Sequence, residues 1–598
     1  MRKRLFISLF IFWLLFFLLG KMLFAATCGE AGWGELFVAL WHGLPLDLST
    51  ICYILSVPVL ALYASTVWRK MPLRAILMPW HCVSVLLSAG AVLLDIALYP
   101  FWQFKLNATI LNYVESPGEA AASVSTGFVV WRTLLFVVIA ALALWRLWSV
   151  TPARLQRTSP FHLLHAPLVI ALFFLVIRGG VGEGTMNVGN CYHSQRMFMN
   201  HVAVNPLFSF IASMNRSDAT GSMFRLMPES ECRQTFDSLY AKEGARRAPQ
   251  VVRRQRPNVL VILWEGGGAS FFHPMGGLLG VMPNLEEMSC EGVLFDNMRC
   301  TSWRTDRGMV SALSGWFAYP SLTLMRMPVI CDRLPCLGRT FSREGYDTFF
   351  LYGGDISYTH TSGYLTAGGY NTLISDKDFT LAERRTEKWG VTDSITFERL
   401  YDEVVSRSDG DRPWHGGMLT LSSHEPFKVP YSKYADEVLN AMSYTDHCLG
   451  RFMRRLKARR EVWDNLLVVI LPDHGYAYND MARTDPGFFR VPMVWTGGAV
   501  GRPHMEDALM SQSDMPATLL GALGIDHSDY PYSRDALDSA YVNQWAYSAT
   551  SEFVVLEDTA GRTIYNLQTN TAEDTDTLRL HRLKAVLQGS HTVLDSKK

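Results

Sequence analysis

Long apolar runs fill the first 180 residues of the chain. Five of these runs are long enough to cross about 30 Å of hydrocarbon as a helix. They cover residues 5–24, 48–67, 74–98, 127–147 and 162–180. The pattern therefore predicts a multi-pass α-helical membrane domain at residues 1–180 with five transmembrane helices.

After residue 257 the pattern changes to short apolar runs that alternate with amphipathic segments. At 435–458 apolar residues recur at alternating steps of four and three, which is typical of a helix with one buried face, and another helix begins near 513–516. Strands alternating with helices predict an α/β sandwich, in which the chemistry gathers beyond the carboxyl ends of the strands. The predicted strands lie at 258–264, 348–352, 416–421, 465–471 and 491–496.

Length and pattern set the remaining boundaries. At 598 residues the chain is long enough for two or more domains. Residues 181–256 carry only helix-like patches such as 208–214, so we expect a linker with interfacial helices there. The α/β domain is expected at 257–540, followed by a strand-rich extension at 541–598.

The placement of basic residues predicts the orientation in the membrane. Arginine and lysine precede the first apolar run and separate the second from the third and the fourth from the fifth. The intervening segments, 25–47 and 99–126, hold one lysine and no arginine. The positive-inside rule therefore sends the chain after residue 180 to the outer side. A formal net charge of zero with 18% charged residues argues against a nucleic-acid partner.

A motif at residues 300–315 carries the candidate nucleophile. It begins Cys300-Thr-Ser-Trp-Arg-Thr305 and ends in Leu313-Ser-Gly315. This motif resembles those of sulfatases and of the lipoteichoic acid synthase and phosphoethanolamine transferase branches of the alkaline phosphatase superfamily. Sulfatases oxidise a cysteine to formylglycine, and this nucleophile stands ten residues before the closing glycine of the motif. Counting back ten residues from Gly315 in this chain gives Thr305 and not Cys300. Ser302 also replaces the proline of the sulfatase motif, so the resemblance implies a threonine nucleophile.

Two polar positions that follow predicted strands complete a candidate metal site. Glu265 comes directly after the first strand, and Asp473-His474 follows the run at 465–471 through one proline. Together with the oxygen of Thr305 they offer three hard oxygens and one imidazole nitrogen, a set suited to Mn²⁺, Zn²⁺ or Mg²⁺. We expect one divalent metal ion, Mn²⁺ in the first place, because a threonine hydroxyl needs activation to act as a nucleophile.

Three more segments resemble the lipoteichoic acid synthases. Ser-His424-Glu-Pro-Phe resembles the family segment Ser-His-x-Pro-Phe, which makes His424 the candidate to stabilise or protonate the leaving oxygen. Asp355, in Tyr-Gly-Gly-Asp, resembles a family aspartate that touches the head group. Asp393 ends another recurring segment, Trp-Gly-Val-Thr-Asp. Asp355 and Asp393 are therefore substrate-binding candidates, with a structural role as the alternative.

The segment after Asp355 departs from the family pattern. The synthases carry Phe-Trp-Asn-Arg there, and that arginine serves the glycerol phosphate, whereas this chain has Thr359-His-Thr-Ser362. His360 is the remaining substrate-binding candidate at this place, unless it only fills the loop. The glycerophosphate substrate is accordingly less certain than the transfer chemistry.

The resemblance implies metal-dependent transfer of a phospholipid head group, of glycerophosphate type, through a phosphothreonine intermediate. The expected donor is a membrane phospholipid and the acceptor a hydroxyl of a glycan or lipid. The expected location is the bacterial inner membrane, with the catalytic domain on the extracytoplasmic side. The alternatives are phosphoethanolamine transfer, hydrolysis of a sulfuric or phosphoric ester, and a non-catalytic membrane lipid sensor.

Overall fold

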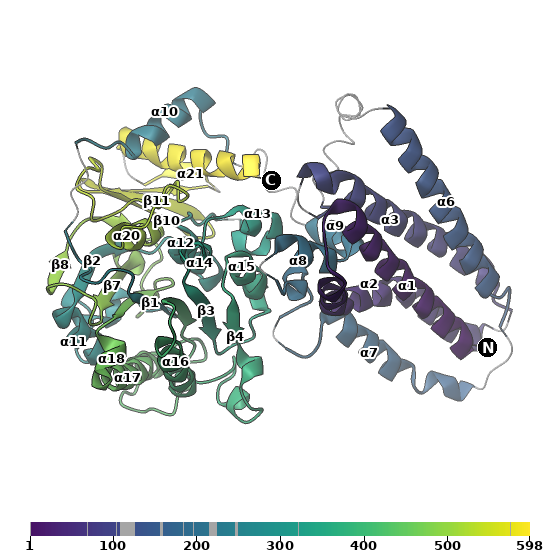
Figure 1. Cartoon of the computed structure of the whole chain (residues 1–598), viewed down its shortest axis with the longest axis horizontal. Coiled ribbons are helices and arrows are strands. Elements are labelled where there is room, and N and C mark those ends of the chain that lie inside the picture. The colour runs from purple at the N-terminus through teal and green to yellow at the C-terminus, as the bar shows by residue number, and fades with distance from the viewer. Residues whose placement is uncertain are drawn as a thin grey trace. The chain divides into compact units, whose positions relative to one another are not determined.

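The chain was analysed as a computed structural model that describes most of its length in two compact units, Met1–Thr220 and Gly221–Lys598 (Figure 1). The predicted linker at 181–256 is therefore divided between the two units. The described residues are 2–597 without 69, 103–104, 108–109, 111–125, 156–159, 183, 195, 215–223, 245–248, 321, 568 and 574–575.

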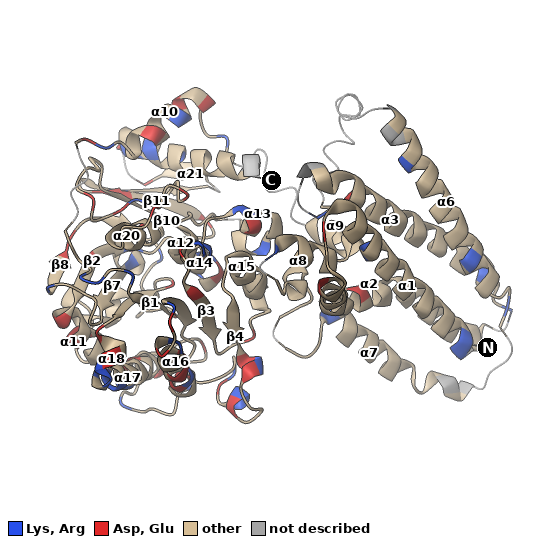
Figure 2. Ribbon diagram, viewed as in Figure 1, with Lys and Arg blue, Asp and Glu red and all other residues tan. Residues whose placement is uncertain are grey.

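The first unit contains the apolar helices. Within the described residues, four helices are long and apolar enough to span a membrane, and they match the first four predicted runs. Figure 2 shows long uncharged stretches along these helices. They are α1 (Arg2–Cys28), α2 (Trp33–Val67), α3 (Leu73–Trp102) and α6 (Thr126–Val150).

The fifth predicted run differs from the other four. It forms α7 (Ala166–Arg178), a helix of 13 residues that ends at Gly179 in the left-handed conformation. At 1.5 Å per residue such a helix is about 20 Å long, which is short for about 30 Å of hydrocarbon. A fifth crossing thus stays a prediction.

Buried ion pairs hold the first unit together. Lys21 Nζ lies 2.6 Å from Asp47 Oδ2, and Asn205 Nδ2 donates to Asp47 Oδ1 at 2.8 Å. Asn205 lies between α8 (Met197–Ala203) and α9 (Pro206–Met214), which contact α1, α2 and α3. Buried charges are tolerated in apolar surroundings when they are paired. The first part of the predicted linker therefore packs as part of the helical unit.

A mixed sheet forms the centre of the second unit. Its strands follow the order β4-β3-β5-β1-β6-β7-β2-β8, and β9 also pairs with β2. Predicted strands correspond to β1 (Asn258–Trp264), β3 (Asp347–Tyr352), β5 (Trp414–Leu419), β6 (Leu466–Pro472) and β7 (Arg490–Thr496). The sequence pattern did not predict β2 (Val293–Arg299), β4 (Thr372–Ile374), β8 (His504–Glu506) and β9 (Met510–Ser511).

Strand direction brings distant loops to one edge of the sheet. β1 pairs in parallel with β5 on one side and with β6 on the other. β7 is antiparallel to both β6 and β2, so β2 runs in the same direction as β6. The carboxyl ends of β1, β2, β5 and β6 therefore face the same edge.

Helices cover both faces of this sheet, as Figure 1 shows. A large apolar core joins one face to α11 (Pro283–Glu291), α16 (Asp393–Ser408) and α17 (Glu437–Ala458). On the other side lie α12 (Thr305–Ser314), α14 (Leu337–Arg343) and α20 (Met515–Ala522), of which α12 contacts the other two. This is the predicted α/β sandwich.

The end of the chain is only partly rich in strands. Strands β10 (Trp545–Ala549), β11 (Phe553–Asp558), β12 (Gly561–Asn566) and β13 (Thr571–Ala572) form an antiparallel sheet. A helix of 21 residues follows, α21 (Thr577–Lys597), because Leu583, Val586, Leu587 and Leu594 recur at helical spacing and are buried. This helix packs on β11 and β12 and against α10 (Glu229–Leu239).

Candidate active site

The predicted metal ligands come together at the shared sheet edge. Glu265 follows β1 directly, Asp473 and His474 follow β6, and Thr305 is the first residue of α12. The Thr305 hydroxyl donates to Glu265 Oε2 at 3.0 Å. His474 Nε2 lies 3.1 Å from Glu265 Oε1 and 3.7 Å from Asp473 Oδ2. Side chains up to 209 positions apart in the sequence thus form one cluster.

The donor set fits a divalent cation. Ligand atoms of Glu265, Asp473 and His474 lie within 4.8 Å of one another. Asp473 Oδ1 accepts from the backbone N–H groups of Gly266 at 3.0 Å and His474 at 2.8 Å. Asp473 Oδ2 is buried and accepts no hydrogen bond from the described part of the protein. A cation at this place would satisfy that oxygen, since buried polar atoms otherwise carry a large cost.

The charges in the cluster also favour a bound cation. Burial, and then the negative charge of Glu265, raise the pKa of Asp473. Burial lowers the pKa of His474, but the carboxylates of Asp473 and Glu265 outweigh burial and raise it. Two carboxylates at this distance repel each other, and a nearby positive charge relieves that repulsion. A divalent cation held by Glu265, Asp473 and His474 would supply such a charge.

Close backbone packing holds α12, which begins at Thr305, against the loop that carries Asp473 and His474. A Cβ atom at Gly308 would lie 1.9 Å from the carbonyl oxygen of Asp473, so only glycine fits there. Gln512 Nε2 donates to the same carbonyl at 2.8 Å. The side chain of Arg304, the residue before α12, makes no capping hydrogen bond to the helix. The N-terminal amides of α12 are therefore placed to hold an anionic oxygen next to Thr305.

Cys300 has a different environment from Thr305. The cysteine is fully buried, its sulfur accepts from Gly475 N at 3.2 Å, and burial raises the pKa of its thiol to about 12. Thiol chemistry requires an accessible thiolate. Cys300 thus braces the loop that carries His474, and Thr305 is the hydroxyl that faces the cluster.

His424 lies beside this cluster on the loop after β5. Its ring is partly exposed and lies 4.8 Å from the ring of Trp389, measured between centroids. Its Nδ1 is 2.9 Å from the carbonyl oxygen of Glu425. The neighbouring Ser423 hydroxyl donates to the Glu265 carbonyl at 2.6 Å and ties this loop to the metal ligands. The role of His424 near the leaving oxygen stays a prediction.

Asp355 lies in the loop that follows β3. It is partly exposed, and its Oδ1 accepts from Ser357 N at 2.9 Å. Tyr352 is the last residue of β3, directly before this loop. Burial raises the pKa of Tyr352, and the charges of Glu265, Asp355 and Asp473 raise it further. Sequence reasoning missed Tyr352, although its place at a strand end was a usable signal.

His360 and Asp393 differ in how far they support a substrate role. His360 adopts the left-handed conformation, with φ 69°, ahead of α15 (Thr361–Ala367). Asp393 is fully buried, and its carboxylate accepts from Leu421 N at 2.9 Å, Ser422 N at 3.2 Å and the Thr445 hydroxyl at 2.7 Å. These bonds fasten the loop before His424, so the geometry favours the structural alternative for Asp393.

Sequence reasoning also missed an arginine cluster at the start of α12. Asp306 Oδ1 lies 3.1 Å from Arg307 Nη1, and its Oδ2 lies 3.6 Å from Arg326 Nη2. Arg307 is largely buried, and its guanidinium stacks 4.5 Å from the ring centroid of Trp303. Burial lowers the pKa of Arg307, and Arg304 and Arg326 lower it further. Three guanidinium groups thus accompany one carboxylate beside the nucleophile.

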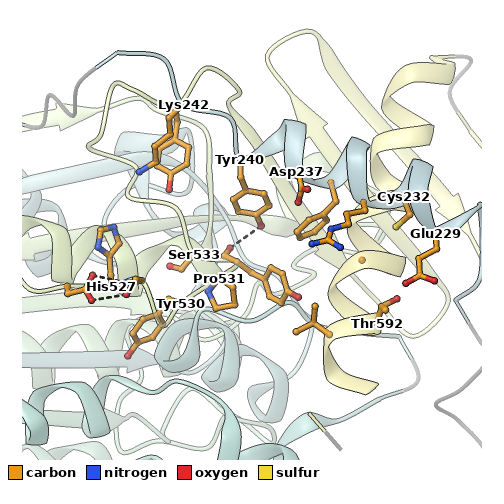
Figure 3. A pocket seen from close by; sticks show the side chains of 18 residues that line it. Glu229, Cys232, Asp237, Tyr240, Lys242, His527, Tyr530, Pro531, Ser533 and Thr592 are labelled. Atoms are coloured by element: carbon orange, nitrogen blue, oxygen red, sulfur yellow. Dashed lines mark hydrogen bonds between the residues drawn. The ribbon is translucent and has the colours of Figure 1, made fainter. Parts of the chain in front are cut away.

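A cavity of about 820 Å³ lies elsewhere in the second unit (Figure 3). It opens between α10, α21 and the segment around Pro531, with Tyr240, Tyr530 and Thr592 among its walls. Of the described residues that line it, none belongs to the predicted site. The chemistry therefore belongs to the sheet edge and not to this cavity.

Comparisons with known proteins agree with this architecture. Residues 257–525 match the family model described as Sulfatase. Phosphoglycerol transferase I of Xanthomonas campestris pv. campestris is 25% identical over 258 residues, which cover 40% of this chain and 36% of that protein. The match thus spans little more than a third of that relative's length.

Two solved structures share the fold. A protein in the alkaline phosphatase superfamily from Vibrio parahaemolyticus is 22% identical, with a TM-score of 0.54 over 62% of this chain and 98% of that one. The lipoteichoic acid synthase LtaP from Listeria monocytogenes is 17% identical, with a TM-score of 0.51 over 61% of this chain and 98% of that one. Residues 257–525 of this chain therefore match the Sulfatase family model, and the chain shares the fold of these two solved structures.

Proposed function

We propose that the protein transfers a phospholipid head group, of glycerophosphate type, from a membrane lipid to a hydroxyl of a glycan or lipid. The observation that carries this proposal is the Thr305 hydroxyl, which donates to Glu265 at 3.0 Å inside the cluster with Asp473 and His474. Similarity to proteins named phosphoglycerol transferase I supports the choice of head group.

Four residues would hold one divalent metal ion. Glu265, Asp473 and His474 provide the ligand atoms, with the Thr305 oxygen as the fourth, and Mn²⁺ is the first choice for such a mixed oxygen and nitrogen set. When bound, the ion supplies positive charge that favours the threonine alkoxide and the charged phosphoryl oxygens.

The residues of the chain divide the transfer into two steps. In the first, the Thr305 oxygen forms a bond to phosphorus, its proton passes to solvent water, and the bond to the diacylglycerol oxygen breaks as His424 protonates that oxygen. In the second, an acceptor hydroxyl gives its proton to His424 and bonds to phosphorus, and the bond to Thr305 breaks as its oxygen takes a proton back from solvent water. Amides at the start of α12 hold a phosphoryl oxygen in both steps.

The apolar helices would keep the site close to its lipid. Four helices long enough to span a membrane precede the catalytic domain, and anchoring both enzyme and donor in one bilayer raises their effective concentration. The basic loops between the predicted helices support a location in the bacterial inner membrane, with the catalytic domain on the extracytoplasmic side.

Mass spectrometry of the full-length protein tests the proposal. After incubation with phosphatidylglycerol and Mn²⁺, the peptide that contains Thr305 should carry a glycerophosphate group. Thr305→Ala should remove the adduct and lower the release of diacylglycerol by about 10³-fold or more, whereas the exposed control Thr380→Ala should retain both. A variant Thr305→Ala with full activity would overturn the mechanism.

Phosphoethanolamine transfer is the second candidate. The segment Thr359-His-Thr-Ser362 favours this candidate, because it has no arginine where the synthases carry the arginine that serves glycerol phosphate. Incubation with phosphatidylethanolamine in place of phosphatidylglycerol would then give the Thr305 adduct with the mass of phosphoethanolamine.

A further inference from the structure

The loop that lacks the expected arginine lies against another arginine-bearing segment. Hydroxyl groups of Thr359 and Thr361 lie 3.8 Å and 3.5 Å from the sulfur of Met325. Met325 belongs to a 3-10 turn, Leu324–Arg326, that contacts the turn Tyr358–His360. Arg326 therefore belongs to a turn that lies directly against the loop at 358–361.

Asp306 connects Arg326 to the nucleophile. It directly follows Thr305 in α12, its side chain is only 3% exposed, and its Oδ2 lies 3.6 Å from Arg326 Nη2. Arg307, on the other oxygen of Asp306, is 11% exposed and also donates to the Tyr319 carbonyl at 3.2 Å. Arg326 is 42% exposed. Of the two guanidinium groups that Asp306 holds, that of Arg326 is the one open to a ligand in solvent.

The charge and shape of this cluster suit a phosphate ester. Arg307 and Arg326 flank the carboxylate of Asp306, and Arg304 directly precedes Thr305, so positive charge is in excess beside Thr305. A guanidinium group presents planar, paired donors that match two phosphate oxygens. The same excess of charge repels a head group that carries an ammonium ion, and such repulsion is a common source of specificity.

We propose that Arg326, positioned by Asp306, binds the phosphate of the donor head group and replaces the arginine that is missing at residues 359–362. This inference rests on the proposed head-group transfer. It also selects among donors, because a glycerol head group is uncharged, whereas an ethanolamine head group places its ammonium ion near three arginines.

Binding and turnover of the full-length, Mn²⁺-loaded protein test this assignment separately. Glycerol phosphate is the probe for binding, measured by calorimetry, and phosphatidylglycerol in mixed micelles is the substrate for turnover. Arg326→Ala should weaken glycerol phosphate binding about tenfold and raise KM for phosphatidylglycerol to a similar extent, with kcat within about threefold. Arg326→Lys keeps the charge but loses the paired donors. Its glycerol phosphate affinity and its KM should therefore lie between those of Arg326→Ala and of the wild type. The control Arg343→Ala, at an exposed pair with Asp529, should match the wild type.

Selectivity provides a third readout. The ratio of kcat/KM for phosphatidylglycerol over phosphatidylethanolamine should fall in Arg326→Ala, since the repulsion of ammonium weakens. Unchanged glycerol phosphate affinity in Arg326→Ala overturns the assignment, as does a loss confined to kcat, which would mean that Arg326 only supports Asp306.

Failure of the proposed function has a different signature. In that case the wild type forms no Thr305 adduct from either lipid, yet the affinity for glycerol phosphate still decides the role of Arg326.

Discussion

Gly308 meets Asp473 in direct backbone contact: a Cβ atom on the glycine would lie 1.9 Å from the aspartate's carbonyl oxygen. The helix that begins with Thr305 is thereby set at a fixed distance from the loop that carries two metal ligands. Any side chain at position 308 must push the two segments apart. The position of the nucleophile relative to the ligands thus depends on a residue with no chemistry of its own.

Gly308→Ala should therefore damage activity more than stability. The methyl group forces a shift of the order of an ångström between α12 and the loop, and misplacement of that size costs about 10²-fold in rate, while overpacking costs about 1–3 kcal/mol in the free energy of unfolding. Diacylglycerol release and urea unfolding would measure the two effects. Gly410→Ala, where the nearest atom to a new Cβ lies 3.3 Å away, is the matched control. Equal activity of both variants would contradict this prediction.

Mn²⁺ should stabilise the wild-type protein but not Asp473→Asn. A ligand that binds only the folded state at 100 times its Kd adds about 2.7 kcal/mol to the free energy of unfolding, which thermal unfolding with and without Mn²⁺ would show as a higher Tm. The variant removes the negative charge and puts an amide nitrogen, which does not bind a cation, in place of one carboxylate oxygen of a side chain whose Oδ2 has no hydrogen bond from the described residues. Asp464→Asn, at the surface before β6, should keep the full increase in Tm.

Cys300→Ala should retain formation of the Thr305 adduct. The thiol is buried and accepts only one backbone N–H at 3.2 Å, so its loss should cost about 1 kcal/mol in unfolding free energy and change the rate by less than about tenfold. Quantifying the adduct by mass spectrometry in this variant and in Thr305→Ala separates the two residues. An enzyme that depends on formylglycine at residue 300 would lose all activity instead.

Asp393→Asn should destabilise the domain, because the buried carboxylate fastens a loop. Its two carboxylate oxygens accept three hydrogen bonds from Leu421, Ser422 and Thr445, and an amide nitrogen facing these donors would leave at least one unpaired. The expected loss is about 1–3 kcal/mol in the free energy of unfolding, measured by urea titration. Asp402→Asn, exposed on the same helix, should be neutral. Since the loop to His424 is fastened by these bonds, kcat should fall as well.

Glu387→Gln should change how stability depends on pH. Burial, and then the charge of Asp393, raise the pKa of Glu387 from 4.5 to about 7. A raised folded-state pKa gives stability that is complete below pH 4.5 and lost as pH rises through 7. Glutamine copies the neutral acid, so the variant should match the wild type near pH 5 and exceed it by on the order of 2 kcal/mol near pH 8. Thermal unfolding across this range would show it, with Glu437→Gln as the surface control. A difference in stability between Glu387→Gln and the wild type that stays the same at all pH values would contradict this prediction.

The sequence predicted the metal ligands because each follows an unbroken apolar run, and the rule that chemistry lies beyond strand ends then applies. β2 was missed because Asp296 and Asn297 interrupt its apolar pattern at a bulge between Phe295 and Met298. Asp393 was assigned to the substrate because a local motif carries no information on burial.

Arg326 could not be found from the sequence. Its partner Asp306 lies twenty positions away in the chain, and its neighbour loop at 358–361 lies still further. Such proximity depends on how 3-10 turns and short helices fold back over α12, which no periodicity records. The fold class and the candidate metal ligands can thus be predicted from local patterns, whereas the pairing of Arg326 with Asp306 depends on packing.

The hydrogen bond between Glu265 and His474 can form only late in the synthesis of the chain. It joins residues 209 positions apart, and β6, which carries His474, must pair with β1 before the bond can form. Pairings of such long sequence separation form late, because the intervening chain must first be brought together. A nascent chain cannot complete the metal site until residue 474 has emerged. Metal loading at this candidate site should consequently mark a domain in which β6 has already paired with β1.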